Sequence, residues 1–170
     1  MNIKEVVLKR RSIRKFNDKK ISDEIIKDIL EAAMAAPSAC NLQPWEFFVI
    51  KNKDIQEEIR VRASRFTNYN SSLIIVVAGN EKKSLPGRLK DFWQQDCSAA
   101  IENMLLMATY HNIGTCWCGL YPNIESVEKV REILKQEKHI VPLALIHLGY
   151  YDENVEPRSQ YDDAKVHIID

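Results

Sequence analysis

Residues 10–16 place four cations and one hydroxyl group close together, directly after a short amphipathic stretch. Planar guanidinium groups bind phosphate through paired, charge-assisted hydrogen bonds, each worth about 1.5–3 kcal/mol. Ser12 offers a neutral donor to the same oxygen atoms. A basic run taken alone is also typical of a solvated surface or of a nucleic-acid patch. Taken alone, the run favours such a surface, and a phosphate site is the alternative that its donors would suit.

Two further segments combine small, amide-bearing and glycine residues. Residues 37–45 read Pro-Ser-Ala-Cys-Asn-Leu-Gln-Pro-Trp, and residues 112–122 read Asn-Ile-Gly-Thr-Cys-Trp-Cys-Gly-Leu-Tyr-Pro. Gly114 and Gly119 in the second segment permit close backbone approach to a flat ligand. Backbone N–H groups can then face the polar atoms of that ligand.

The tripeptide Cys116-Trp117-Cys118, taken alone, is compatible with a metal site or a redox pair. Its spacing is not the two-residue gap of zinc knuckles, and the four histidines of the chain are scattered. We therefore expect no metal site. We expect the two thiols to point to opposite faces of a strand, which would prevent them from acting as redox partners in turnover.

Length and composition are those of an ordinary globular protein. The chain has 170 residues, 45% of them apolar and 28% charged, which predicts one domain over residues 1–170. Its 24 basic and 24 acidic side chains give a net charge of zero, which argues against nucleic acid or an anionic membrane as the main partner. No signal core and no stretch near the ~20 apolar residues of a membrane span is visible. We expect a cytoplasmic protein with reduced thiols.

Periodicity and capping signals predict alternating helices and strands. Asn2 with Glu5 forms a capping box, Ser22 caps a second helix that Pro37 stops, and Asp54 with Glu57 starts a third. The remaining expected elements are strands at 46–50, 73–79, 115–119 and 142–149 and helices at 91–112 and 124–135. This order indicates an α/β or α+β sandwich of three layers.

Three expectations concern large or charged side chains. The helix at 91–112 is apolar nearly all round at residues 104–108, so we expect it to be buried on every side, in a core or between subunits. We expect Trp45 and Trp117 to pack against the sheet or the next helix. A favourable position in the helix dipole explains Asp96 without catalysis.

The order of the three segments and of the apolar helix resembles the nitroreductase family over nearly the whole chain. This resemblance implies an α+β, three-layer α-β-α sandwich that forms an intertwined homodimer with FMN at the interface. It implies that Arg10, Ser12 and Arg14 hold the phosphate, with Arg11 and the tail residue Arg158 contributing. The tail, residues 152–170, would wrap the partner subunit. The family often has a second basic residue beside Arg158, where this chain has Glu156 and Pro157. The resemblance further implies flavin contacts from the other subunit at Pro37, Ser38, Ala39, Asn41 and Gln43, and contacts along the ring at Thr115, Cys116, Trp117, Cys118 and Gly119.

The favoured function is an FMN-dependent oxidoreductase. NAD(P)H would deliver a hydride, leave, and be replaced by a nitroaromatic, a quinone or a similar acceptor in a ping-pong mechanism. Because the flavin carries the redox chemistry, no catalytic side chain is expected. Arg14 or Lys15 could also favour the anion of the reduced flavin. Three alternatives stay open: flavin storage or sensing with little turnover, another reduction such as dehalogenation or alkene reduction, and a nucleic-acid-binding domain.

Overall fold

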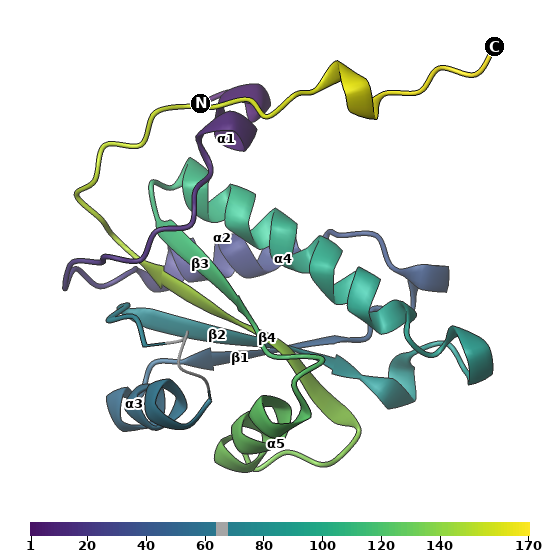
Figure 1. Cartoon of the computed structure of the whole chain (residues 1–170). Helices are drawn as coiled ribbons and strands as arrows, with labels where there is room; N and C mark the ends of the chain where they lie inside the picture. Colours follow the sequence, from purple (N-terminus) through teal and green to yellow (C-terminus); the bar gives the residue numbers. More distant parts are fainter. Residues whose placement is uncertain (64–67) are drawn as a thin grey trace.

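The computed structural model describes residues 1–63 and 68–170, and these form a four-stranded antiparallel sheet with helices on both sides (Figure 1). The strand order is β1-β2-β4-β3, so consecutive strands in the chain are not all neighbours in the sheet. The pairing of β2 with β4 shifts register between Val77 and Ala78, where Leu143 of β4 is an extra residue beside Pro142, which has no N–H group to donate to a ladder. The strands are β1 Trp45–Ile50, β2 Leu73–Asn80, β3 Gly114–Gly119 and β4 Ile140–Gly149.

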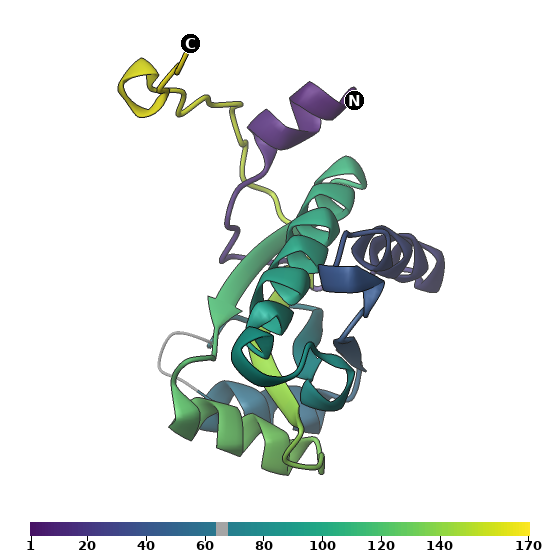
Figure 2. The ribbon, with the colours of Figure 1, turned by 90° about the vertical axis from the view of Figure 1, so that its right-hand side faces the viewer.

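The helices flank the sheet in two pairs. In both views α2 and α4 lie on one side, and α3 and α5 lie on the other (Figures 1 and 2). The first helix, α1, packs at the C-terminal half of α4, and the C-terminal segment passes beside it (Figure 1). The helices are α1 Ile3–Lys9, α2 Asp23–Met34, α3 Lys53–Arg62, α4 Phe92–Tyr110 and α5 Ile124–Ile133, with short 3-10 turns at Ala39–Asn41, Glu81–Lys83, Gly87–Leu89 and Asp163–Lys165.

The capping signals hold in detail. Glu5 N donates to Asn2 Oδ1 and Asn2 N donates to Glu5 Oε2, both at 3.0 Å, which closes the capping box of α1. Ser22 caps α2 as predicted. The third helix begins one residue before Asp54, because the side chain of Asn52 accepts the first free N–H groups.

The core contains the two central strands and one face of α4. Every residue of β2 is buried, as its apolar run predicts. Within the single chain α4 is not buried on every side, because Tyr110 is 51% exposed and Met107 is only partly buried, so its complete burial stays a prediction for an interface between subunits. These two residues line a groove of about 340 Å³ together with Ile3 and Val6 of α1.

The mixed α+β class is confirmed. Trp45 is buried as expected, whereas Trp117 is 37% exposed, so the expectation for Trp117 is wrong within one chain. The C-terminal segment runs away from the sheet with Ile168 and Ile169 at 82% and 93% exposure. Among the described residues, no helix has the length and apolar character needed to cross a bilayer.

Candidate functional site

Three arginines from the two ends of the chain gather where α1 ends. Arg158 N donates to Leu8 O at 3.0 Å, and Arg11 Nη2 donates to Glu156 O at 2.7 Å, so the C-terminal segment is tied to α1. Burial, and the charges of Arg158 and Arg10, lower the pKa of Arg11. Arg10 Nε lies 3.7 Å from Glu102 Oε1 on α4. We call Arg10, Arg11 and Arg158 the arginine cluster; a multiply charged anion would relieve its mutual repulsion.

Arg14 lies in a different environment from the arginine cluster. Its guanidinium makes a hydrogen bond with Tyr69, and this bond, together with nearby Cys116, raises the pKa of Arg14. Its Nη1 also approaches Ser12 O at 3.4 Å. Arg14 therefore faces β3, whereas the grouping expected from the sequence put it with Arg10 on one phosphate.

Residues 12–13 lie beside the first half of β3. Ile13 N donates to Thr115 O at 2.8 Å, and Ser12 forms an isolated parallel bridge with Thr115. A Cβ atom on Gly114 would lie 2.9 Å from Ile13 Cβ. Gly114 is thus required for packing of the chain on itself, which corrects its expected role in ligand approach.

The outer edge of β3 presents backbone donors. Thr115 O faces outward to Ile13, whereas Leu120 N bonds back to Leu143 O in β4 at 2.9 Å. Because backbone polar groups alternate in direction along a strand, Trp117 and Gly119 direct their N–H groups outward and Cys118 directs its N–H group toward β4. Apart from the two chain neighbours of Gly119, no atom of the described residues lies within 4 Å of the space that a Cβ atom on Gly119 would fill.

The segment 37–43 is a strained loop after α2. Cys40, Asn41 and Gln43 have φ angles of 51°, 54° and 49°, which non-glycine residues rarely adopt. Ser38 holds the loop closed, since its Oγ accepts from Gln43 N at 3.0 Å and its carbonyl accepts from Asn41 N at 3.0 Å. Pro37, Asn41 and Gln43 are exposed, and Ala39 is half-buried.

Asp96 anchors this loop to α4. Its Oδ1 accepts from Ala39 N at 2.8 Å, and the residue is only 6% exposed. Its negative charge, after burial, contributes to raising the pKa of Cys97 to about 12. The dipole explanation missed this contact. Asp96 falls on the buried stripe of the helix with Trp93 and Ala100, and a carboxylate at such a position is the signal that could have found it.

The loop and the arginine cluster do not meet within the described part of one chain. Asp96 and Glu102, which contact them, lie on the same helix but about 120° apart around its axis. This fold brings the N-terminal basic segment next to β3. The tail residue Arg158 lies beside the basic segment. The loop remains apart.

Cys116 and Cys118 point to the same face of β3, so the sequence-based expectation of opposite faces is wrong. Residues two apart on a strand share a face. The two Sγ atoms lie 4.0 Å apart, and both residues are buried. Among the described residues, no group of three or more His, Cys, Asp or Glu side chains could hold a metal ion.

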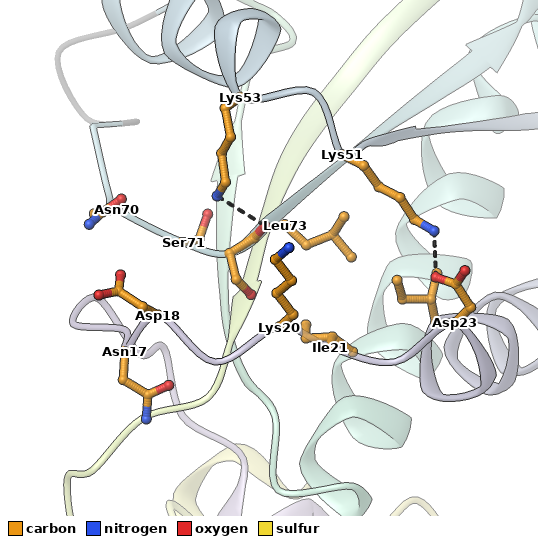
Figure 3. A pocket seen from close by; sticks show the side chains of 12 residues that line it. Asn17, Asp18, Lys20, Ile21, Asp23, Lys51, Lys53, Asn70, Ser71 and Leu73 are labelled. Atoms are coloured by element: carbon orange, nitrogen blue, oxygen red, sulfur yellow. Dashed lines mark hydrogen bonds and ion pairs between the residues drawn. The ribbon is translucent and has the colours of Figure 1, made fainter.

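A separate crevice of about 370 Å³ opens between the segment before α2 and the start of β2 (Figure 3). Lys20, Lys51 and Lys53 line it together with Asp18 and Asp23. Lys51 is paired with Asp23, and Lys53 donates to a backbone carbonyl. Because positive and negative groups are mixed in it in similar number, this crevice lacks the excess of positive charge of the arginine cluster, and we assign it no ligand.

Comparison with known proteins gives one family. Residues 7–71 and 61–150 match the model of the nitroreductase family. A protein of Methanothermobacter thermautotrophicus, provisionally named NADH dehydrogenase/NAD(P)H nitroreductase, is 36% identical over 99% of this chain and 87% of its own length.

Solved structures agree with this match. A Parabacteroides distasonis protein with the same provisional name has a TM-score of 0.89 and 32% identity, covering 98% of this chain and 96% of that one. An FMN-dependent nitroreductase of Clostridium difficile R20291 has a TM-score of 0.84 and 31% identity, with 98% of both chains covered.

Proposed function

Because this chain belongs to the nitroreductase family, we propose that it is an FMN-dependent oxidoreductase that takes hydride from NAD(P)H. It would pass the electrons to a nitroaromatic, a quinone or a similar acceptor in a second half-reaction. The observation that carries this proposal is the arginine cluster beside the outer edge of β3. It offers an anion site next to backbone donors, as a phosphorylated flavin requires.

The residues present fit FMN in chemistry and in charge. A phosphate monoester carries about −1.5 to −2 at neutral pH, which suits three guanidinium groups of which one has a lowered pKa. Arg10, Arg11 and Arg158 would hold that phosphate, with Ser12 as a neutral donor. The backbone of Thr115, Cys116, Trp117 and Cys118 and the open space at Gly119 would border the ring. Arg14, beside β3, would face the ring end of the cofactor.

The chemistry needs little from side chains. When bound, FMN supplies the acceptance of hydride and the delivery of electrons. The outward N–H groups of Trp117 and Gly119 would orient polar ring atoms, and Arg14 would favour a negative charge that develops near it. No general acid, base or nucleophile is required of this chain.

We propose a homodimer of three-layer subunits that completes the site. The loop 37–43 would reach the flavin of the other subunit, because it lies away from the arginine cluster of its own chain. The groove between α1 and α4, with Tyr110 and Met107 at its surface, would be covered by the partner. Residues 1–170 would form a single domain. Its C-terminal segment, residues 152–170, would extend over the partner subunit.

The test is the spectrum and the steady state of the purified protein. A bound flavin gives visible absorbance, and NAD(P)H oxidation is then followed with a quinone, a nitroaromatic and a halogenated aromatic. Turnover with the first two supports the proposal. Preference for the halogenated compound would indicate reductive dehalogenation. Flavin binding without turnover for any acceptor would replace the enzyme with a storage or sensing protein.

A further inference from the structure

The proposed flavin site uses the backbone of β3 and leaves the side chains of its buried thiol pair without an assigned role. Cys116 and Cys118 project from the same face of an edge strand with 4.0 Å between their sulfur atoms. Their strand neighbours in β4 are His147 and Leu145. The other two cysteines are different: Cys40 is exposed on a loop, and Cys97 is buried in α4 with Ala78 O 3.6 Å from its Sγ.

The surroundings of the pair favour one negative charge. Arg14 approaches from residues 10–16, Tyr69 from the segment before β2, and His147 from β4. The hydrogen bond from Cys118, with the charge of Arg14, lowers the pKa of Cys116 to about 7, whereas the same bond and burial raise the pKa of Cys118. Cys116 is therefore the sulfur atom of the pair that more readily carries the negative charge.

We propose that Cys116 and Cys118 form a redox site that reduces a small hydroperoxide and closes to a disulfide. In the first step the Cys116 thiolate attacks one peroxide oxygen. An S–O bond forms, the O–O bond breaks, and the departing alkoxide or hydroxide takes a proton from water. The product is a sulfenic acid on Cys116.

In the second step Cys118 resolves this sulfenic acid. Its sulfur attacks Cys116 Sγ, an S–S bond forms, and the S–O bond breaks. The departing hydroxide takes the Cys118 proton and becomes water. Two thiols have then lost two electrons and two protons, and the hydroperoxide has gained them, so no further reactant is needed.

The position on the strand permits closure but demands a local adjustment. Residues two apart on a strand have Cα atoms about 6.6 Å apart, near the upper end of the range for disulfides. The sulfur atoms must approach from 4.0 Å to about 2.05 Å. The strand ends at Gly119, which has open space where a Cβ atom would lie, and we expect this end of an edge strand to move more easily than a central strand.

The chemistry predicts a modest rate advantage for Cys116. At pH 7 a thiol with a pKa near 7 is roughly 15-fold richer in thiolate than an ordinary thiol, but its nucleophilicity is about fivefold lower. The net gain is roughly threefold. The nearby Cys118 then makes the reaction stop at a disulfide.

The proposal does not rest on flavin binding, so it can be tested on the protein as isolated. Fully reduced protein is treated with hydrogen peroxide, denatured, alkylated and analysed by mass spectrometry of intact protein and of peptides. We expect the loss of two hydrogen atoms, confined to the peptide with Cys116 and Cys118. Cys40→Ser and Cys97→Ser are the matched controls and should behave like the wild type.

The two site variants separate the steps. Cys118→Ser should stop at a sulfenic acid on Cys116 that a dimedone probe captures, and Cys116→Ser should leave Cys118 reduced. If either variant fails to fold, peptide mapping of the wild type still decides. Four alkylated cysteines after peroxide, over-oxidation of Cys116 without a disulfide, or pairing with Cys40 or Cys97 would overturn the proposal.

Discussion

The contact between Asp96 and the loop 37–43 gives a sharp prediction. Asp96→Ala removes a buried carboxylate that accepts from Ala39 N at 2.8 Å and leaves that N–H group without its acceptor. Asp96→Asn keeps an acceptor oxygen but removes its charge. The two variants therefore separate loss of the hydrogen bond from loss of its charge.

The expected magnitude follows from the bond and from the strain it restrains. A hydrogen bond to a charged group contributes about 1.5–3 kcal/mol, and a neutral one about 1 kcal/mol. The left-handed backbone conformation costs roughly 1 kcal/mol at each of Cys40, Asn41 and Gln43. The loop would therefore lower its conformational free energy by about 3 kcal/mol if all three residues left this region. Loss of the bond should shift the loop to other conformations. FMN affinity should then fall roughly 10- to 100-fold in Asp96→Ala and about fivefold in Asp96→Asn.

The measurements are FMN titration by fluorescence quenching and thermal unfolding of the apo protein. Asn123→Ala is the matched control, because Asn123 also accepts from a backbone N–H group, that of Ser126, at 3.1 Å. It lies at the start of α5, on the other side of the sheet, and should lower stability by about 1 kcal/mol without changing FMN affinity. If Asp96→Ala and Asn123→Ala lose stability alike and both bind FMN like the wild type, the loop does not position the cofactor.

Three other outcomes are expected. Arg158→Ala should lower the affinity for FMN roughly tenfold or more and leave the affinity for riboflavin unchanged, whereas Arg14→Ala should lower both affinities. Titrations with the two ligands test this, and an equal loss of affinity for FMN and riboflavin in Arg158→Ala would contradict a phosphate role. The rate of Cys116 oxidation by peroxide should rise between about pH 6 and 8 and then level off, since the thiolate gains population as pH passes its lowered pKa of about 7; a rate that keeps rising above pH 9 would refute it. Deleting residues 154–170 should weaken dimerisation and flavin binding together. Analytical ultracentrifugation at protein and flavin wavelengths measures both, and a stable, flavin-loaded dimer or a flavin-loaded monomer would contradict this expectation.

Local rules in the sequence predicted much of the fold. Capping boxes depend on side chains three residues apart, and Asn2 with Glu5 behaves as this rule requires. The unbroken apolar run of β2 is buried throughout because two neighbouring strands and the flanking helices cover it. The start of α3 was displaced by one residue, because Asn52 is the better acceptor for the first N–H groups.

The candidate site needed information that local rules do not contain. The meeting of Arg11 with Arg158 depends on hydrogen bonds across 145 residues of chain. Asp96 was assigned to the helix dipole because a sequence pattern reports charge at a helix start but not the loop that will pack against it. The expectation for the thiol pair was wrong for a simpler reason. It put Cys116 and Cys118 on opposite faces of the strand, whereas residues two apart on a strand lie on the same face.

The position of β3 in the sheet explains how these parts would form the proposed site. The order β1-β2-β4-β3 makes β3 an edge strand, and an edge strand has one row of backbone groups that the sheet does not use. Ser12 and Ile13 occupy this row only at Thr115, so among the described residues the outward N–H groups of Trp117 and Gly119 are not covered by a strand. The same segment 10–16 that covers Thr115 also brings Arg14 to the sulfur atoms and Arg11 to the tail. A strand edge with unpaired backbone groups, which would otherwise favour aggregation, thus lies next to concentrated positive charge. A flat anionic cofactor can accept hydrogen bonds from the backbone N–H groups of this edge and neutralise the charge.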